Sequence, residues 1–69
     1  MQLSEKIKMI RKTCFLSQDA FAKEIGVAFS TVNRWENGRT EPNYKDLRTL
    51  DDFCKKHDIK MSLTDSEIS

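Results

Sequence analysis

Hydrophobic residues recur along this chain with the period of an α-helix. Leu3, Ile7, Ile10 and Cys14 are spaced at i, i+4, i+7 and i+11, which places them on one face of an amphipathic helix. Charged side chains, mostly lysine and arginine, occupy the other faces. The pattern therefore predicts a first helix through these four positions.

A second, short helix is predicted between Ser17 and Gly26. Ser17 is a good N-cap residue, and Gly26 suits the left-handed position that follows many helices. The apolar face of this helix comprises Phe21, Ala22 and Ile25. Because Gly26 adopts a left-handed conformation without a steric cost, a sharp turn is expected directly after the helix.

A third helix needs only Val27 and Ala28 as its connection to the second. Val32 and Trp35 continue the apolar stripe, and Gly38 is placed to end the helix. Since Trp35 shares the stripe of Val32, we expect it in the core rather than as a platform for stacking bases.

A fourth helix is predicted after Pro42, with Asn43 as its N-cap. Its apolar positions are Leu47, Leu50 and Cys54, together with Tyr44 and Phe53.

Residues 1–58 are thus expected to form one domain, with a short tail over 59–69. The tail alternates apolar and polar residues, which suits a short strand or an extended segment. Residues 64–67 resemble a capping box, so the tail either frays or leads into a helix beyond Ser69.

The composition limits the kinds of function. Sixty-nine residues leave room for one domain, and a formal net charge of +1 excludes polyanion binding by overall charge alone. No apolar run approaches the ~20 residues of a membrane span, and the first residues do not resemble a secretory signal. We therefore expect a cytoplasmic protein with no membrane contact.

Candidate catalytic and metal-binding chemistry is sparse. Cys14 and Cys54 lie at apolar positions, where small buried side chains are favoured over a redox pair. His57 has no second ligand at metal-binding spacing. No nucleophile–histidine pair or glycine-rich phosphate loop is present in the sequence. We expect no metal, no cofactor and no enzymatic activity.

Two short helices joined by a glycine-containing turn form a helix-turn-helix. Ala22 is small where the helices must approach closely, Gly26 permits the turn, and Val32 is expected to be buried at the crossing point. The polar faces of the third helix are then left pointing away from the bundle. They carry Phe29, Ser30, Asn33, Arg34 and Asn37.

These residues resemble the Cro/CI-type, or XRE-like, helix-turn-helix repressors. The matching segments are Leu16-Ser17-Gln18, residues 22–27, residues 31–39 and Pro42, within a resemblance that extends from Leu3 to Cys54. The resemblance implies a compact all-α bundle of four or five helices, of the lambda-repressor-like type. It also implies that the third helix docks in the major groove of double-stranded DNA.

The resemblance further implies roles for individual residues. Phe29, Ser30, Asn33 and Arg34 match the positions that recognise bases. Ser17, Gln18, Asn37 and Arg39 match positions that contact the DNA backbone. Arg11 and Glu36 match an ion pair that ties the first helix to the end of the third.

Side-chain chemistry suits these roles. Arg34 can bind guanine O6 and N7 through two hydrogen bonds, and Asn33 can pair with adenine N6 and N7. Ser30 suits several acceptors, so it discriminates weakly. Phe29 lies three residues before Val32, so it either packs inward or faces a thymine methyl group.

The sequence departs from the family pattern in three ways. Phe15 stands where the family often has glycine, so that turn is built differently or strained. Ala28 stands where a serine or threonine often caps the third helix. From Ser17 to Asn43, three basic residues face four acidic ones, a balance of −1 that predicts modest non-specific affinity for DNA.

We expect a sequence-specific transcriptional regulator, acting as a repressor and as a homodimer. Two alternatives remain. The first is an antitoxin-type module that binds DNA and also a toxin through residues 59–69, and the second is a protein-interaction module that has lost DNA binding.

Overall fold

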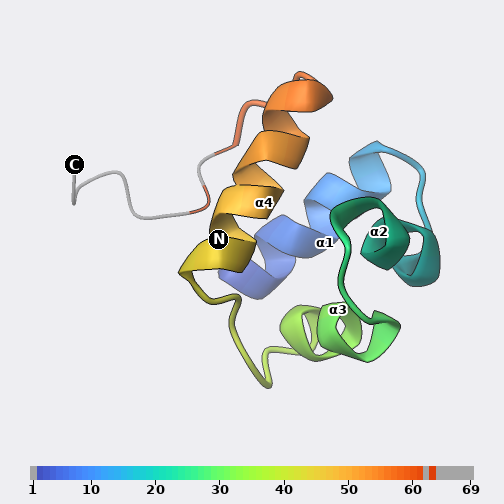
Figure 1. Ribbon diagram of the computed structural model, residues 1–69, viewed down its shortest axis with the longest axis vertical. Coiled ribbons are helices and arrows are strands. Elements are labelled where there is room, and N and C mark those ends of the chain that lie inside the picture. The colour runs from blue at the N-terminus through green and yellow to red at the C-terminus, as the bar shows by residue number, and fades with distance from the viewer. Residues whose placement is uncertain (1, 62, 64–69) are drawn as a thin grey trace.

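The computed structural model describes residues 2–61 and residue 63. In that part of the chain it contains four helices and no strand (Figure 1). The helices are α1 (Leu3–Thr13), α2 (Gln18–Ile25), α3 (Phe29–Glu36) and α4 (Tyr44–Lys56). The predicted all-α bundle is confirmed, with helices close to the expected bounds. None of the described helices is both long and apolar enough to span a bilayer.

The apolar faces of the four helices meet in one core. Phe21 of α2 and Phe53 of α4 pack edge to face, with ring centroids 5.2 Å apart. Trp35 is 3% exposed, so its predicted core position is confirmed. Cys54 is buried as expected, whereas Cys14 is only half-buried because it follows the last turn of α1. The buried members are Ile7, Ile10, Phe21, Ala22, Ile25, Val32, Trp35, Leu50, Phe53, Cys54 and Leu63.

Local capping chemistry sets where the helices begin. The Ser17 hydroxyl accepts a hydrogen bond from the Ala20 backbone N–H at 3.1 Å, at the start of α2. Asn43 Oδ1 accepts one from the Asp46 N–H at 2.8 Å, at the start of α4. Both caps were predicted, and α3 begins after Ala28 with no side-chain cap. Alanine in place of a capping residue at this position lowers the free energy of unfolding by about 1 kcal/mol.

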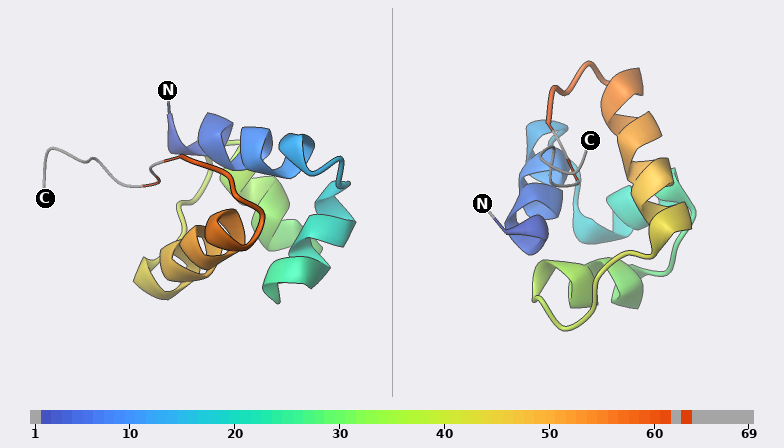
Figure 2. Two further views of the ribbon diagram at one scale, coloured as in Figure 1. Left: turned by 90° about the horizontal axis from the view of Figure 1, so that it is seen from above. Right: turned by 90° about the vertical axis from the view of Figure 1, so that its left-hand side faces the viewer.

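The chain after α4 turns back toward α1 (Figure 2). Residues 59–61 form neither helix nor strand. Ile59 and Met61 are half-buried, and Leu63 is buried, so these alternating side chains pack against the core. The segment lies between α1 and α4, away from α3. The capping-box sequence over 64–67 lies outside the described residues.

The turn between α1 and α2 is strained at Phe15. Its backbone is left-handed, with φ +58°, and its side chain is 96% exposed. The turn closes through hydrogen bonds from the Phe15 N–H to the Lys12 carbonyl and from the Leu16 N–H to the Arg11 carbonyl. A left-handed conformation costs a residue with a Cβ roughly 1–2 kcal/mol. The exposed ring gains little contact to offset that cost.

We expect Phe15→Asn to stabilise the fold, because asparagine adopts left-handed φ more readily than phenylalanine. Urea unfolding followed by circular dichroism should show an increase of about 1 kcal/mol in the free energy of unfolding. Phe15→Ala is the matched control, since it removes the ring but keeps the Cβ and the strain. Equal stability of the two variants would contradict this explanation.

Candidate nucleic-acid interface

The arrangement of α2 and α3 is that of a helix-turn-helix. Three residues, Gly26 to Ala28, separate the two helices. Gly26 has φ +76°, and the Val27 N–H donates to the Ala22 carbonyl at 3.0 Å, so the chain reverses immediately after α2. Ala22 is 1% exposed and Val32 fully buried. Close packing of these small and branched side chains fixes α3 against α2.

One side of α3 remains accessible. Val32, Trp35 and Glu36 point into the protein, whereas Ser30 and Arg34 are exposed. Figure 1 shows α3 along the lower edge of the molecule, where only the loop between α3 and α4 reaches lower. Phe29 is 49% exposed, so of its two predicted placements the outward one fits the structure.

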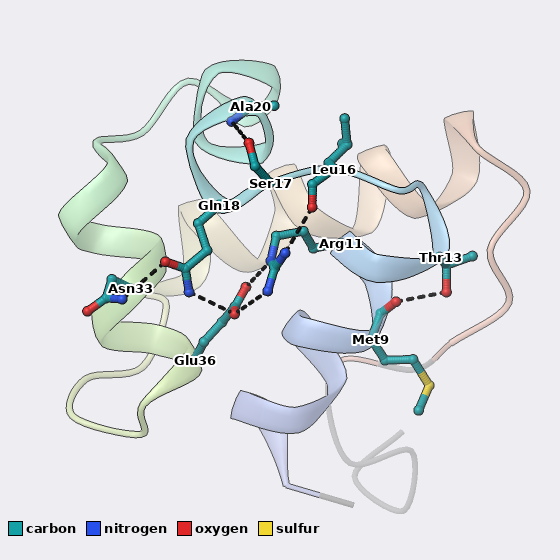
Figure 3. Close-up of polar contacts among 9 residues, drawn as sticks. All are labelled: Met9, Arg11, Thr13, Leu16, Ser17, Gln18, Ala20, Asn33 and Glu36. Atoms are coloured by element: carbon teal, nitrogen blue, oxygen red, sulfur yellow. Dashed lines mark hydrogen bonds and ion pairs between the residues drawn. The ribbon is translucent and has the colours of Figure 1, made fainter.

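The C-terminal end of α3 is linked to α1 by an ion pair (Figure 3). Arg11 Nε and Nη2 donate to the two carboxylate oxygens of Glu36 at 2.7 and 2.9 Å. The remaining guanidinium nitrogen, Nη1, donates to the Leu16 carbonyl at 2.8 Å. The side chains of Arg11 and Glu36 are 13% and 1% exposed. This two-bonded geometry is the strong form of an arginine–carboxylate contact.

Burial and pairing act in opposite directions on Glu36. Burial raises the pKa of Glu36, but hydrogen bonds from Arg11 and Gln18 and the charges of Arg11 and Lys8 together lower it below its ordinary value. On the partner, the hydrogen bond to Glu36 raises the pKa of Arg11. The pair is therefore ionised at neutral pH.

The hydrogen bonds continue from Glu36 to the polar side of α3. Gln18 Nε2 donates to Glu36 Oε1 at 3.0 Å, and Asn33 Nδ2 donates to Gln18 Oε1 at 3.1 Å (Figure 3). Asn37 Nδ2 then donates to Asn33 Oδ1 at 3.1 Å. Gln18, expected only to contact phosphate, is thus half-buried and already engaged within the protein. No motif pointed to this connection.

The other predicted backbone-contacting residues lie near the ends of the two helices. Ser17 is exposed at the N-terminus of α2, next to free backbone N–H groups that favour an anion. Asn37 and Arg39 are exposed just after α3, where the Arg39 N–H donates to the Arg34 carbonyl at 3.0 Å. These groups lie at the start of α2 and just after the end of α3.

The charge balance of the motif is less acidic than the sequence count suggests. Glu36 is buried and neutralised by Arg11 from outside the counted segment, which leaves three basic against three acidic residues on the surface. These are Lys23, Arg34 and Arg39 against Asp19, Glu24 and Glu41. Lys8 adds positive charge close to Glu36, and the spacing of α1 placed it only on a charged face of that helix.

Comparison with known proteins agrees with this geometry. A family model described as helix-turn-helix matches residues 7–58, so the chain belongs to this XRE-type helix-turn-helix family. It is similar to BcrR of Enterococcus faecalis, an HTH-type transcriptional activator, with 28% identity over 53 residues. The match covers 77% of this chain and about a quarter (26%) of that relative's length. No solved structure is significantly similar. The family and the relative support a DNA-binding transcription regulator.

We expect acid to destabilise the fold through Glu36. Its pKa in the folded state lies below the ordinary value of 4.5, so the unfolded state binds more protons in mild acid. The stabilisation by ionised Glu36 is fully present at pH values above the pKa of Glu36 in the unfolded chain. It is lost as the pH falls through the lower pKa of Glu36 in the folded protein. Thermal unfolding in sucrose, which strengthens marginal folds, should show a midpoint that falls with pH more steeply for the wild type than for Glu36→Gln.

The matched control is Glu24→Gln, which removes an exposed carboxylate of α2. This variant should keep the acid sensitivity of the wild type. An unchanged pH dependence in Glu36→Gln would show that the ion pair contributes little to stability.

Proposed function

We propose that this chain binds double-stranded DNA sequence-specifically by inserting α3 into the major groove, and that it regulates transcription as a repressor. The observation that carries the proposal is the accessible polar side of α3, anchored from beneath by Val32, Trp35 and Glu36. A rigid helix with an unobstructed polar face matches the width of the major groove. Its family membership and the relative named above support the same class of function.

Base recognition is assigned to the exposed residues of α3 and to the half-exposed Asn33. Arg34 has an exposed guanidinium suited to the two acceptors of guanine, and Ser30 and Phe29 lie one turn nearer the N-terminus of the helix. Backbone contacts are assigned to the N-terminus of α2, with Ser17 and Gln18, and to Asn37 and Arg39. These contacts position α3 without selecting a sequence.

We further propose that the protein acts as a homodimer. An eight-residue α3 reaches few base pairs, so useful specificity requires a second copy on a half-site ~34 Å away. Occupation of promoter DNA would then repress transcription. The antitoxin alternative has less to support it, because Ile59, Met61 and Leu63, its expected toxin contacts, pack against the protein's own core.

The proposal predicts salt-sensitive binding to duplex DNA with a sequence preference. Selection of bound duplexes from a random pool gives the preferred site, and fluorescence anisotropy at two salt concentrations gives the affinity. Arg34→Ala should lose about 1–3 kcal/mol on the preferred site and relax the preference at one base pair.

Lys56→Ala is the matched control. It also removes one exposed positive charge, but at the C-terminal end of α4, far from α3 (Figure 1). Its site preference should equal that of the wild type. Absence of duplex binding at low salt would refute the proposed function and favour a protein-interaction module.

A further inference from the structure

The side-chain amides on the DNA-facing side form a single chain that ends on a buried carboxylate. Asn37 donates to Asn33, Asn33 to Gln18, and Gln18 to Glu36, with donor–acceptor distances of 3.0–3.1 Å. This chain of hydrogen bonds crosses from Asn33 of α3 to Gln18 of α2 and back to Glu36 of α3. Asn37, Asn33 and Gln18 each donate through a side-chain N–H. Asn33 and Gln18 also accept through their side-chain oxygens.

The chemistry of Glu36 fixes the direction of this chain. An ionised carboxylate only accepts hydrogen bonds, so Gln18 must present its Nε2 to Glu36. Because the amide oxygen and nitrogen of one side chain point apart, Gln18 Oε1 then faces Asn33. Asn33 must in turn present Nδ2 to Gln18, which leaves its oxygen to accept from Asn37. Reversal of any amide would oppose two acceptors or two donors.

We propose that Glu36 is a positioning residue for base recognition. Through Gln18 it fixes the orientation of the Asn33 side-chain amide, that is, the positions of its oxygen and nitrogen relative to DNA. This inference rests on the proposed function. It goes beyond the structural role expected for the ion pair, because the same carboxylate sets the order of donor and acceptor on α3.

The fixed order pre-positions Asn33 for a contact with one base. Of the two N–H groups and two lone pairs of the Asn33 amide, the chain uses one of each. One donor and one acceptor remain on a half-exposed side chain. In the major groove adenine offers one acceptor, N7, and one donor, N6, whereas guanine offers two acceptors, N7 and O6. The donor and acceptor of Asn33 match adenine and not guanine, and the hydrogen bonds to Gln18 and Asn37 leave a single arrangement of these two groups for pairing with it.

The orienting link can be cut without touching the ion pair. Glu36→Gln is the direct variant, but it leaves the Arg11 guanidinium without its counter-charge and can unfold the protein. Gln18→Met removes the amide and keeps a side chain of similar length. Ser17→Ala is the matched control, since Ser17 neighbours Gln18, is also assigned to phosphate, and lies outside the amide chain.

Two measurements decide the inference. In selection from a random pool, the wild type should prefer adenine at one position by about ten-fold, and Gln18→Met should reduce this to about two-fold, with the preference at the base pair of Arg34 unchanged. Ser17→Ala should weaken all sequences and keep both preferences. In DNA-free protein, the side-chain NH₂ resonances of Asn33 should move in Gln18→Met and stay in place in Ser17→Ala.

Each outcome bears on one claim. If wild type binds duplex DNA but Gln18→Met keeps the adenine preference, the orienting role of Glu36 is wrong and the proposed function stands. If Gln18→Met leaves the Asn33 resonances in place, the amide chain itself is refuted. If the wild type binds no duplex, the proposed function fails, whatever the resonances show.

Discussion

The buried carboxylate of Glu36 is the constraint on which the arrangement of the helices depends. A charge that is 1% exposed is strongly destabilising unless it is paired and hydrogen-bonded. Arg11 must therefore reach across from α1 to meet it. The same guanidinium holds the Leu16 carbonyl, just before α2 begins. One pair of side chains thus joins α1, the start of α2 and the end of α3.

This arrangement couples the stability of the fold to the surface proposed for DNA recognition. Glu36 faces the core on one side, and through Gln18 it contacts the polar side of α3 on the other. Hydrogen-bonded side-chain networks in a partly buried setting restrict their members to one arrangement. The proposed recognition surface is accordingly ordered before DNA arrives, so less conformational entropy is lost on binding.

Much of the fold could be predicted because its signals are local. The caps at Ser17 and Asn43 and the left-handed Gly26 each follow from residues within a few positions of one another. Strain at Phe15 was one of two possibilities that the departure from the family's glycine left open. The stripe containing Val32 and Trp35 likewise gave the buried side of α3, since helical periodicity depends only on spacing.

The amide chain could not be predicted, because its partners are 15 and 18 residues apart and belong to different helices. No spacing rule connects Asn33 with Gln18. Periodicity also left Phe29 undecided, since a residue at the start of a short helix lies at the border of its apolar stripe. The packing of Leu63 against the core depends on the path of the chain after α4, for which the alternating pattern gave no direction.

Arg11 and Glu36 act as one unit that ties α1 to α3. A double-mutant cycle of unfolding free energies, with Arg11→Met, Glu36→Gln and the combined variant in sucrose, tests it most directly. Each single substitution should lower the free energy of unfolding by about 3–5 kcal/mol, and the combined variant should lose at least ~1.5 kcal/mol less than the sum of the two. Losses that add within ~0.5 kcal/mol would contradict it.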